Sequence, residues 1–149
     1  MELITLSHND VLSTLPDRKL DSHKGNYGKI LLLCGSEGYT GAPALAALGA
    51  LRSGAGLVYL GVPRCIYNIE SIKLNEPIIF PLPDSGGKFC DSSFADLYAR
   101  LDRIDAILLG PGIGRSNSVT SFVCRILQDY HGTIVLDADG INAISEHIH

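Results

Sequence analysis

Residues 29–60 read KILLLCGSEGYTGAPALAALGALRSGAGLVYL, and this stretch decides the fold class. Apolar runs of strand length at residues 29–34 and 57–62 flank a segment of helical composition at residues 42–52. Continuous apolar runs are typical of strands that are buried on both faces of a parallel sheet. The helix between them is apolar nearly all round, so we expect it to be deeply packed. Strand, helix and strand in this order predict a right-handed βαβ unit.

The same alternation continues along the chain and predicts an α/β fold with a mostly parallel sheet. Residues 81–88 (PLPDSGGK) are rich in Pro and Gly and predict a loop. Residues 92–101 predict an amphipathic helix that buries one face, formed by Phe94, Leu97, Tyr98 and Leu101. The other predicted strands are residues 77–80, 105–109 and 133–136, and the other helices are residues 64–73, a segment from Ser116 or Asn117 to Tyr130, and one that starts near Ile141.

The first 24 residues differ from the rest, so we divide the chain into a polar leader (residues 1–24) and βα units (residues 25–149). Ser7 or Asn9 is a suitable cap for one short leader helix, and Pro16 would stop it. At the other end, the last predicted helix is only a turn or two long when it reaches His149. We therefore expect a truncated domain.

Composition excludes several classes of protein. A net charge of −4 argues against a nucleic-acid surface, which needs a basic stripe. No apolar run is long enough to span a membrane, and the first residues do not resemble a signal peptide. The four cysteines form no C-x-x-C pair, which favours reduced thiols in a cytoplasmic protein over a zinc site or a disulfide scaffold.

Chemistry is expected at three loops that follow predicted strands, because ligands of open α/β sheets bind at the carboxyl ends of the strands. Residues 35–42 and 109–116 are rich in glycine, whose backbone N–H groups can approach a phosphate or a ribose, and Arg115 lies beside the second run. For both, a plain strand-to-helix turn is the alternative. In residues 137–142, Asp137 and Asp139 could hold Mg²⁺ through water or bind ribose hydroxyls; capping of the last helix by Asp139 is the alternative.

Two further features of the sequence concern phosphate binding and catalysis. His23 and Lys24 precede the first strand and could meet a phosphate, or could belong to an exposed leader. The sequence contains no Walker A loop, no G-x-S-x-G nucleophile and no histidines at metal-ligand spacing.

The ordered series of segments resembles the ADP/ATP-dependent NAD(P)H-hydrate dehydratase family. Its most specific block is Ala42 to Val58, and the match begins near Leu12. The segments that carry the resemblance, in chain order, are His23-Lys24-Gly25, Tyr27-Gly28, Gly35-Ser36, Tyr39-Thr40-Gly41-Ala42, Leu45-Ala46-Ala47, Leu51-Arg52-Ser53-Gly54-Ala55-Gly56-Leu57-Val58, Gly110-Pro111-Gly112 and Leu136-Asp137-Ala138-Asp139. The resemblance implies a ribokinase-like three-layer α/β/α fold.

It also implies an enzyme that dehydrates the S epimer of hydrated NADH or NADPH, with ADP or ATP and Mg²⁺ as cofactors. The family's logic is to phosphorylate the ring hydroxyl, because phosphate leaves more readily than hydroxide. Ala42 and Gly112 match positions that contact the hydrated dinucleotide. Gly41, Tyr39, Gly110 and Asp137 are their inferred neighbours, and Asn142 matches the asparagine that follows the family's Asp-Ala-Asp run.

The family's catalytic Asp, in a Gly-Thr-Gly-Asp motif, and its adenine-nucleotide site are expected beyond His149, so we hypothesise that this chain alone is inactive. We also expect a homo-oligomer, a dimer or a tetramer, and a functional link to the NAD(P)HX epimerase. Two alternatives remain: a ribokinase-fold kinase for hydroxymethylpyrimidine or a sugar, and a non-catalytic nucleotide-binding module. The glycine loops alone suit the kinase, and the Ala42–Val58 block argues against it.

Overall fold

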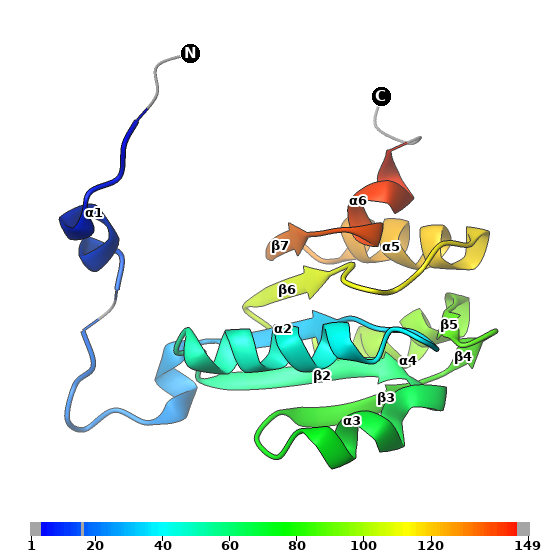
Figure 1. Cartoon of the computed structure of the whole chain (residues 1–149), viewed down its shortest axis with the longest axis horizontal. Helices are drawn as coiled ribbons and strands as arrows, with labels where there is room; N and C mark the ends of the chain where they lie inside the picture. Colours follow the sequence, from blue (N-terminus) through cyan, green and yellow to red (C-terminus); the bar gives the residue numbers. More distant parts are fainter. Residues whose placement is uncertain (1–3, 16, 146–149) are drawn as a thin grey trace.

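The computed structural model describes residues 4–15 and 17–145, and its centre is one parallel sheet (Figure 1). The five strands lie in the order β3-β2-β1-β6-β7, and every neighbouring pair is parallel. Each strand coincides within a few residues with a predicted apolar run, which confirms the sheet expected from the sequence. The strands are β1 (Lys29–Leu33), β2 (Leu57–Pro63), β3 (Ile78–Leu82), β6 (Ala106–Leu109) and β7 (Thr133–Leu136).

Helices cover both faces of the sheet and enclose two separate hydrophobic cores. On one face, α2 (Gly41–Arg52) packs over β1 and β2, and α3 (Tyr67–Lys73), which follows the 3₁₀ turn η2 (Arg64–Ile66), packs against β3. On the other face lie α4 (Asp91–Leu101), α5 (Asn117–Asp129) and α6 (Asp139–Ile144). Leu31 and Leu33 point to the second core while Leu32 points to the first. A strand buried on both sides has no polar face, which explains the continuous apolar runs.

Two burial predictions were wrong. Helix α2 buries only Pro43 and Ala47, whereas Leu45 is 74% and Leu48 38% exposed. The apolar composition suggested deep burial, but α2 packs against the sheet with one side alone. In α4, Phe94, Leu97 and Leu101 are buried as predicted. Tyr98, however, is 57% exposed, and its ring lies beside that of Phe94.

We predicted a loop at residues 81–88, and this prediction was wrong. Strand β3 continues to Leu82, and the chain then forms a hairpin of β4 (Asp84–Ser85) and β5 (Lys88–Phe89). The turn passes through Gly86 and Gly87, which both have positive φ, as tight hairpin turns require. Phe89 is fully buried and stacks on Phe122 of α5 at 4.8 Å between ring centroids, which holds the hairpin against the second core.

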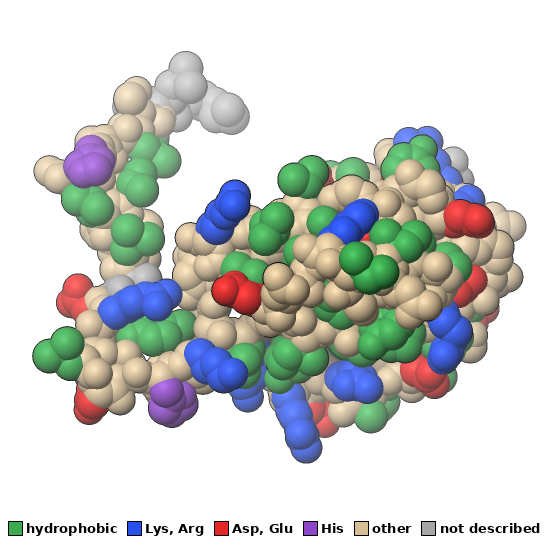
Figure 2. Space-filling view, turned by 60° about the horizontal axis from the view of Figure 1, so that its bottom comes forward, with side chains coloured by type: hydrophobic (Ala, Val, Ile, Leu, Met, Phe, Trp, Pro, Cys, Tyr) green, Lys and Arg blue, Asp and Glu red, His purple; other side chains and the backbone are tan. Residues whose placement is uncertain are grey.

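The part of the leader that the structure describes extends away from the rest of the molecule (Figures 1 and 2). Its helix α1 (His8–Ser13) is capped by Ser7, as predicted, and buries no residue; Pro16 lies outside the described residues. The guanidinium of Arg18 lies 4.4 Å from the centre of the Tyr27 ring, and its Nη2 donates a hydrogen bond to the Gly54 carbonyl at 3.1 Å. These contacts fasten the leader near the amino ends of the strands. Among the described residues, no helix has the length and apolarity needed to cross a membrane.

Candidate functional site

The three loops predicted from the sequence lie side by side at one edge of the sheet. They are the first loop (residues 35–40, between β1 and α2), the second loop (residues 110–116, between β6 and α5) and the third loop (residues 137–138, between β7 and α6). The strands that lead into them, β1, β6 and β7, are consecutive in the sheet and parallel. All three loops therefore leave the same carboxyl edge, the side to which the strand arrows point in Figure 1.

Hydrogen bonds join the first and second loops directly. The N–H of Gly35 donates to the carbonyl of Pro111 at 2.8 Å, and the hydroxyl of Ser36 donates to the carbonyl of Gly112 at 2.7 Å. Ser36 is completely buried, so its hydroxyl serves the structure between the loops and not the solvent. We did not predict a role for Ser36; its only signal in the sequence is a small hydroxyl residue directly after the glycine that ends a buried strand.

Gly112 brings together three of the predicted dinucleotide contacts. Its φ is +68°, and a Cβ added there would lie 2.9 Å from the Cβ of Ala42 and 3.2 Å from that of Tyr39. Only glycine combines this backbone conformation with such a close approach. Tyr39, Ala42 and Gly112 thus meet in space although the chain separates them widely, and Tyr39 is 61% exposed above the contact.

Gly110 and Asp137 form a second contact, between the second and third loops. A Cβ on Gly110 would lie 1.9 Å from the carbonyl oxygen of Asp137, and the Asp137 N–H donates to Leu109 at 3.1 Å. Gly110 is buried, so its role is to let the third loop approach. The Asp137 side chain is exposed and accepts a hydrogen bond from the N–H of Ala138 at 2.8 Å.

Asp139 does not cap α6, so the capping alternative was wrong. Ala138 occupies the cap position with a φ of +48°, and Asp139 is the first helical residue. Its carboxylate instead turns to the second loop, where it accepts from the N–H of Gly114 at 3.0 Å and pairs with Nε of Arg115 at 3.5 Å. Asp139, at the start of α6, therefore stabilises the second loop.

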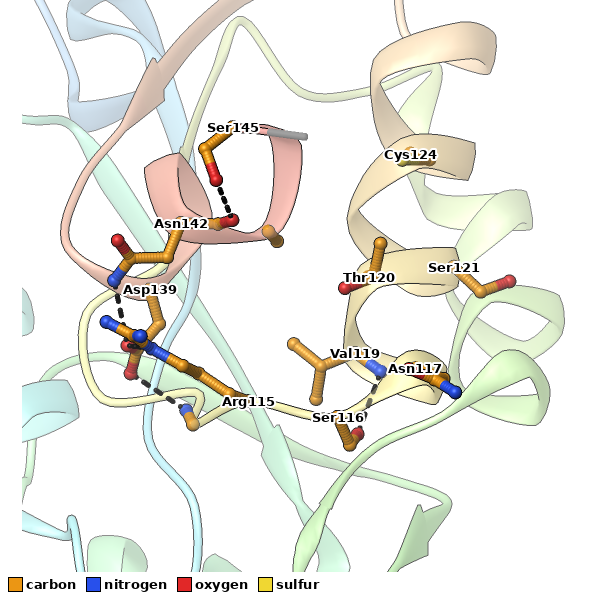
Figure 3. A pocket seen from close by; sticks show the side chains of 12 residues that line it. Arg115, Ser116, Asn117, Val119, Thr120, Ser121, Cys124, Asp139, Asn142 and Ser145 are labelled. Carbon is orange, nitrogen blue, oxygen red and sulfur yellow. Dashed lines mark hydrogen bonds and ion pairs between the residues drawn. The ribbon is translucent and has the colours of Figure 1, made fainter. Parts of the chain in front are cut away.

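Asn142 lies apart from the other predicted site residues. Its Nδ2 is 3.4 Å from Oδ1 of Asp139, and it lines a pocket of about 710 Å³ between α5 and α6 (Figure 3). Arg115, hydroxyl side chains of α5 and Ser145 directly after α6 also line this pocket, whereas no first-loop residue does. The structure thus gathers Tyr39, Ala42 and Gly112 at one contact and Gly110 and Asp137 at another, and it places Asn142 in a neighbouring cavity.

The amino terminus of α2 differs from that of the neighbouring helix at this edge. Helix α5 is capped by Ser116, whose hydroxyl accepts from the N–H of Val119 at 3.1 Å. Helix α2 has Thr40 at its cap position, and no side chain caps it. The backbone N–H groups of its first residues, the predicted contacts Gly41 and Ala42, therefore receive no side-chain cap. Uncapped amides at a helix amino terminus favour an anion such as a phosphate.

The hairpin, which the sequence did not reveal, borders the first two loops. The N–H of Glu37 donates to the carbonyl of Gly87 at 2.9 Å, and Nζ of Lys88 donates to the carbonyl of Arg115 at 3.2 Å. His23 and Lys24, by contrast, lie near Gly56 at the amino edge of the sheet. Their alternative as exposed leader residues is the one that the structure favours.

The buried residue between β1 and the first loop is a cysteine. Cys34 directly follows β1 and is fully buried, and burial, with the nearby Asp137, raises the pKa of its thiol to about 12. That thiol stays protonated and unreactive at neutral pH. All four cysteines are free in the structure. In residues 4–15 and 17–145, no three His, Cys, Asp or Glu side chains come together in a way that could hold a metal ion.

Sequence comparison relates this chain to known proteins. The profile of the carbohydrate-kinase-like family described as NAD(P)H-hydrate dehydratase matches residues 30–149. The bifunctional NAD(P)H-hydrate repair enzymes Nnr of Moorella thermoacetica and Salinibacter ruber are each 38% identical to this chain. Each match covers 89% of this chain but 25% of the relative, so the chain spans about a quarter of the length of these proteins.

Solved structures agree with the predicted ribokinase-like fold. A ribokinase-like superfamily protein from Enterococcus faecalis superposes with a TM-score of 0.79 at 22% identity, over 98% of this chain and 51% of its own. An ADP/ATP-dependent NAD(P)H-hydrate dehydratase from Bacillus subtilis, co-crystallised with ATP/Mg²⁺, superposes with a TM-score of 0.70 at 30% identity, over 91% of this chain and 46% of its own. The fold is confirmed, and this chain corresponds to about half of each of these structures.

Proposed function

The chain belongs to the NAD(P)H-hydrate dehydratase family, and from that premise we propose that it supplies the dinucleotide side of a site that dehydrates the S epimer of hydrated NADH or NADPH. One observation carries the proposal: Gly112 approaches Ala42 and Tyr39 so closely that the loops after β1 and β6 form one surface. A plain strand-to-helix turn would not need this contact between two distant loops.

The neighbouring groups suit a dinucleotide. Gly41 and Ala42 offer backbone N–H groups at the uncapped start of α2, which would bind phosphate oxygens. Tyr39 is exposed beside them and could stack on a ring. Asp137, exposed at the adjacent strand end next to Gly110, would accept hydrogen bonds from ribose hydroxyls.

Asn142 has a less direct part in this proposal. It contacts Asp139, which in turn holds Gly114 and Arg115. We propose that Asn142 supports the second loop from the side of the α5–α6 pocket.

We further propose that the activity uses ADP or ATP with Mg²⁺. The support is the Bacillus subtilis relative, which was co-crystallised with ATP/Mg²⁺. The nucleotide would supply the phosphoryl group that turns the ring hydroxyl into a better leaving group. The described residues of this chain do not form a metal-binding group, so we assign no Mg²⁺ ligand and no catalytic residue to them.

The wider setting is proposed on the same family basis. Residues 1–149 would be the N-terminal part of a single ribokinase-like domain, inactive by itself, in a cytoplasmic dimer or tetramer. A functional link to the NAD(P)HX epimerase is supported by the relatives, which are bifunctional repair enzymes.

A ligand titration of the purified chain tests the proposal. NADPH, a stable stand-in for its hydrate, should raise the melting temperature in a concentration-dependent way, whereas ADP should not. Gly112→Ala should abolish the NADPH effect, because the new methyl group pushes Ala42 and Tyr39 away. Gly38→Ala is the matched control, since φ is also positive there but no atom lies within 4 Å of the added carbon. Stabilisation by ADP alone would instead favour a nucleotide-binding module.

A further inference from the structure

Glu70 of α3 is the one charged side chain in the described part of the chain that is completely buried. Its Oε1 lies 3.2 Å from Nζ of Lys73, one turn further along the helix, and its Oε2 has no hydrogen-bond partner. The ammonium of Lys73 reaches out of α3 and donates to the carbonyl of Thr40 at 2.7 Å. A buried carboxylate is thus connected, through one lysine, to the last residue of the first loop.

This arrangement is unfavourable for folding alone. Burial raises the pKa of the Glu70 carboxyl, and the hydrogen bond and charge of Lys73 offset that only in part. A buried carboxylate oxygen without a partner loses its hydration and gains nothing in return. A neutral side chain of the same size would fit the site better, and groups that lower stability are frequent where function requires them.

The contact with Thr40 indicates what Glu70 and Lys73 do in the structure. Thr40 precedes Gly41 and Ala42, and no side chain caps α2 at this point. The Lys73 ammonium therefore holds the loop backbone at the position where the amides of α2 begin. Lys73 is itself 37% exposed, so without Glu70 its flexible side chain would be free to turn to solvent.

We propose that Glu70 and Lys73 are positioning residues that fix Thr40 and thereby direct the N–H groups of Gly41 and Ala42 toward the bound dinucleotide. The proposal rests on the proposed function for the identity of the ligand. The holding of the loop itself does not depend on any ligand.

Hydrogen exchange of the unliganded chain tests the holding directly. Glu70→Gln and Lys73→Met should each speed exchange of the amides in residues 36–42 by about tenfold, the effect of losing one charged hydrogen bond. Exchange in β1 and β6 should not change. Lys73→Arg should keep exchange slow, because a guanidinium can donate both to the Glu70 carboxylate and to the Thr40 carbonyl. Matched controls are Glu76→Gln and Lys19→Met, which alter exposed residues of the same types outside the pair.

Affinity for NADPH, compared with the melting temperature, separates positioning from simple stabilisation. Glu70→Gln should weaken NADPH binding by about tenfold while the melting temperature stays equal or rises. Unchanged exchange in residues 36–42, or an affinity loss that only follows a fall in melting temperature, would overturn the inference. If the unaltered chain does not bind NADPH at all, the proposed function fails, and the exchange experiment still decides whether the pair holds the loop.

Discussion

The carboxyl edge and the amino edge of the same sheet are built differently. At the carboxyl edge, glycines and a buried serine let the loops after β1, β6 and β7 touch one another through backbone atoms. At the amino edge, the side chain of Arg18 contacts Tyr27 and Gly54, and the backbone of Lys24 lies so close to Gly56 that a Cβ added there would be 1.8 Å from the Lys24 carbonyl oxygen. Backbone contacts tolerate little change, whereas exposed side-chain contacts are easily replaced. The carboxyl edge joins three loops that follow strands, and this is where we propose the binding site; the amino edge joins the leader to the turn before β2.

The largest effect should follow from adding one carbon at the carboxyl edge. Gly110→Ala would place a methyl group 1.9 Å from the carbonyl of Asp137, a collision with backbone that no rotamer relieves. We expect the free energy of unfolding to fall by about 3 kcal/mol or more, measured by urea denaturation.

Gly38→Ala in the first loop is the control for the backbone conformation. Its φ of +84° is also unfavourable for alanine, but the added carbon meets no atom within 4 Å. A loss of about 1–2 kcal/mol is expected from the left-handed conformation alone. Equal losses for the two variants would show that the loops do not press on each other.

Removing one hydroxyl from the carboxyl edge and one from the leader gives the next effect. Ser36→Ala leaves the Gly112 carbonyl without its buried donor and should lower the free energy of unfolding by about 1–3 kcal/mol. Ser13→Ala in the leader removes an exposed bond to the Asp10 carbonyl and should change it by less than about 0.5 kcal/mol. Thermal unfolding of both variants measures the two effects, and a larger loss for Ser13→Ala than for Ser36→Ala would contradict this expectation.

Stability should depend on pH through Glu70. The pKa of its carboxyl is raised by burial above the usual 4.5, so the folded chain binds a proton more tightly than the unfolded chain. The free energy of unfolding then falls as the pH rises from the unfolded pKa through the folded one. Glu70→Gln should remove this fall and stabilise the chain at about pH 8 more than at about pH 4.

The leader offers a contrast in sign. The pKa of Asp10 is lowered by hydrogen bonds from Ser7, so the contribution of that carboxyl is present at neutral pH and is lost on acidification. Urea denaturation across the pH range for Glu70→Gln and Asp10→Asn would separate the two slopes. A Glu70→Gln profile parallel to that of the unaltered chain would refute the assignment.

The smallest effect is expected at the far end of the leader. Removing residues 1–15 should change the free energy of unfolding by less than about 0.5 kcal/mol, because no described residue in this part is buried. Circular dichroism with urea titration measures it. A loss of more than about 1 kcal/mol would show that the leader packs on something and is more than an extension.

Much of this molecule could be read from the amino-acid sequence. Apolar runs located all five strands of the main sheet, and the helix caps Ser7 and Ser116 were each one of two candidates that the sequence offered. The sequence also located the glycine loops and supported the family. Such features are local, because a strand buried on both faces or a hydroxyl before a helix leaves its pattern within a few residues.

Only the tertiary structure decided what the loops do together. The contact of Gly112 with Ala42 and Tyr39, the turn of Asp139 toward Gly114, and the line from Glu70 through Lys73 to Thr40 each join segments that the chain keeps apart. The apolar composition of α2 also led to a wrong prediction of deep burial. Its leucines are exposed because no other element of the described structure covers that side of the helix. Strand order and helix packing bring these groups within contact distance, and a single sequence records neither.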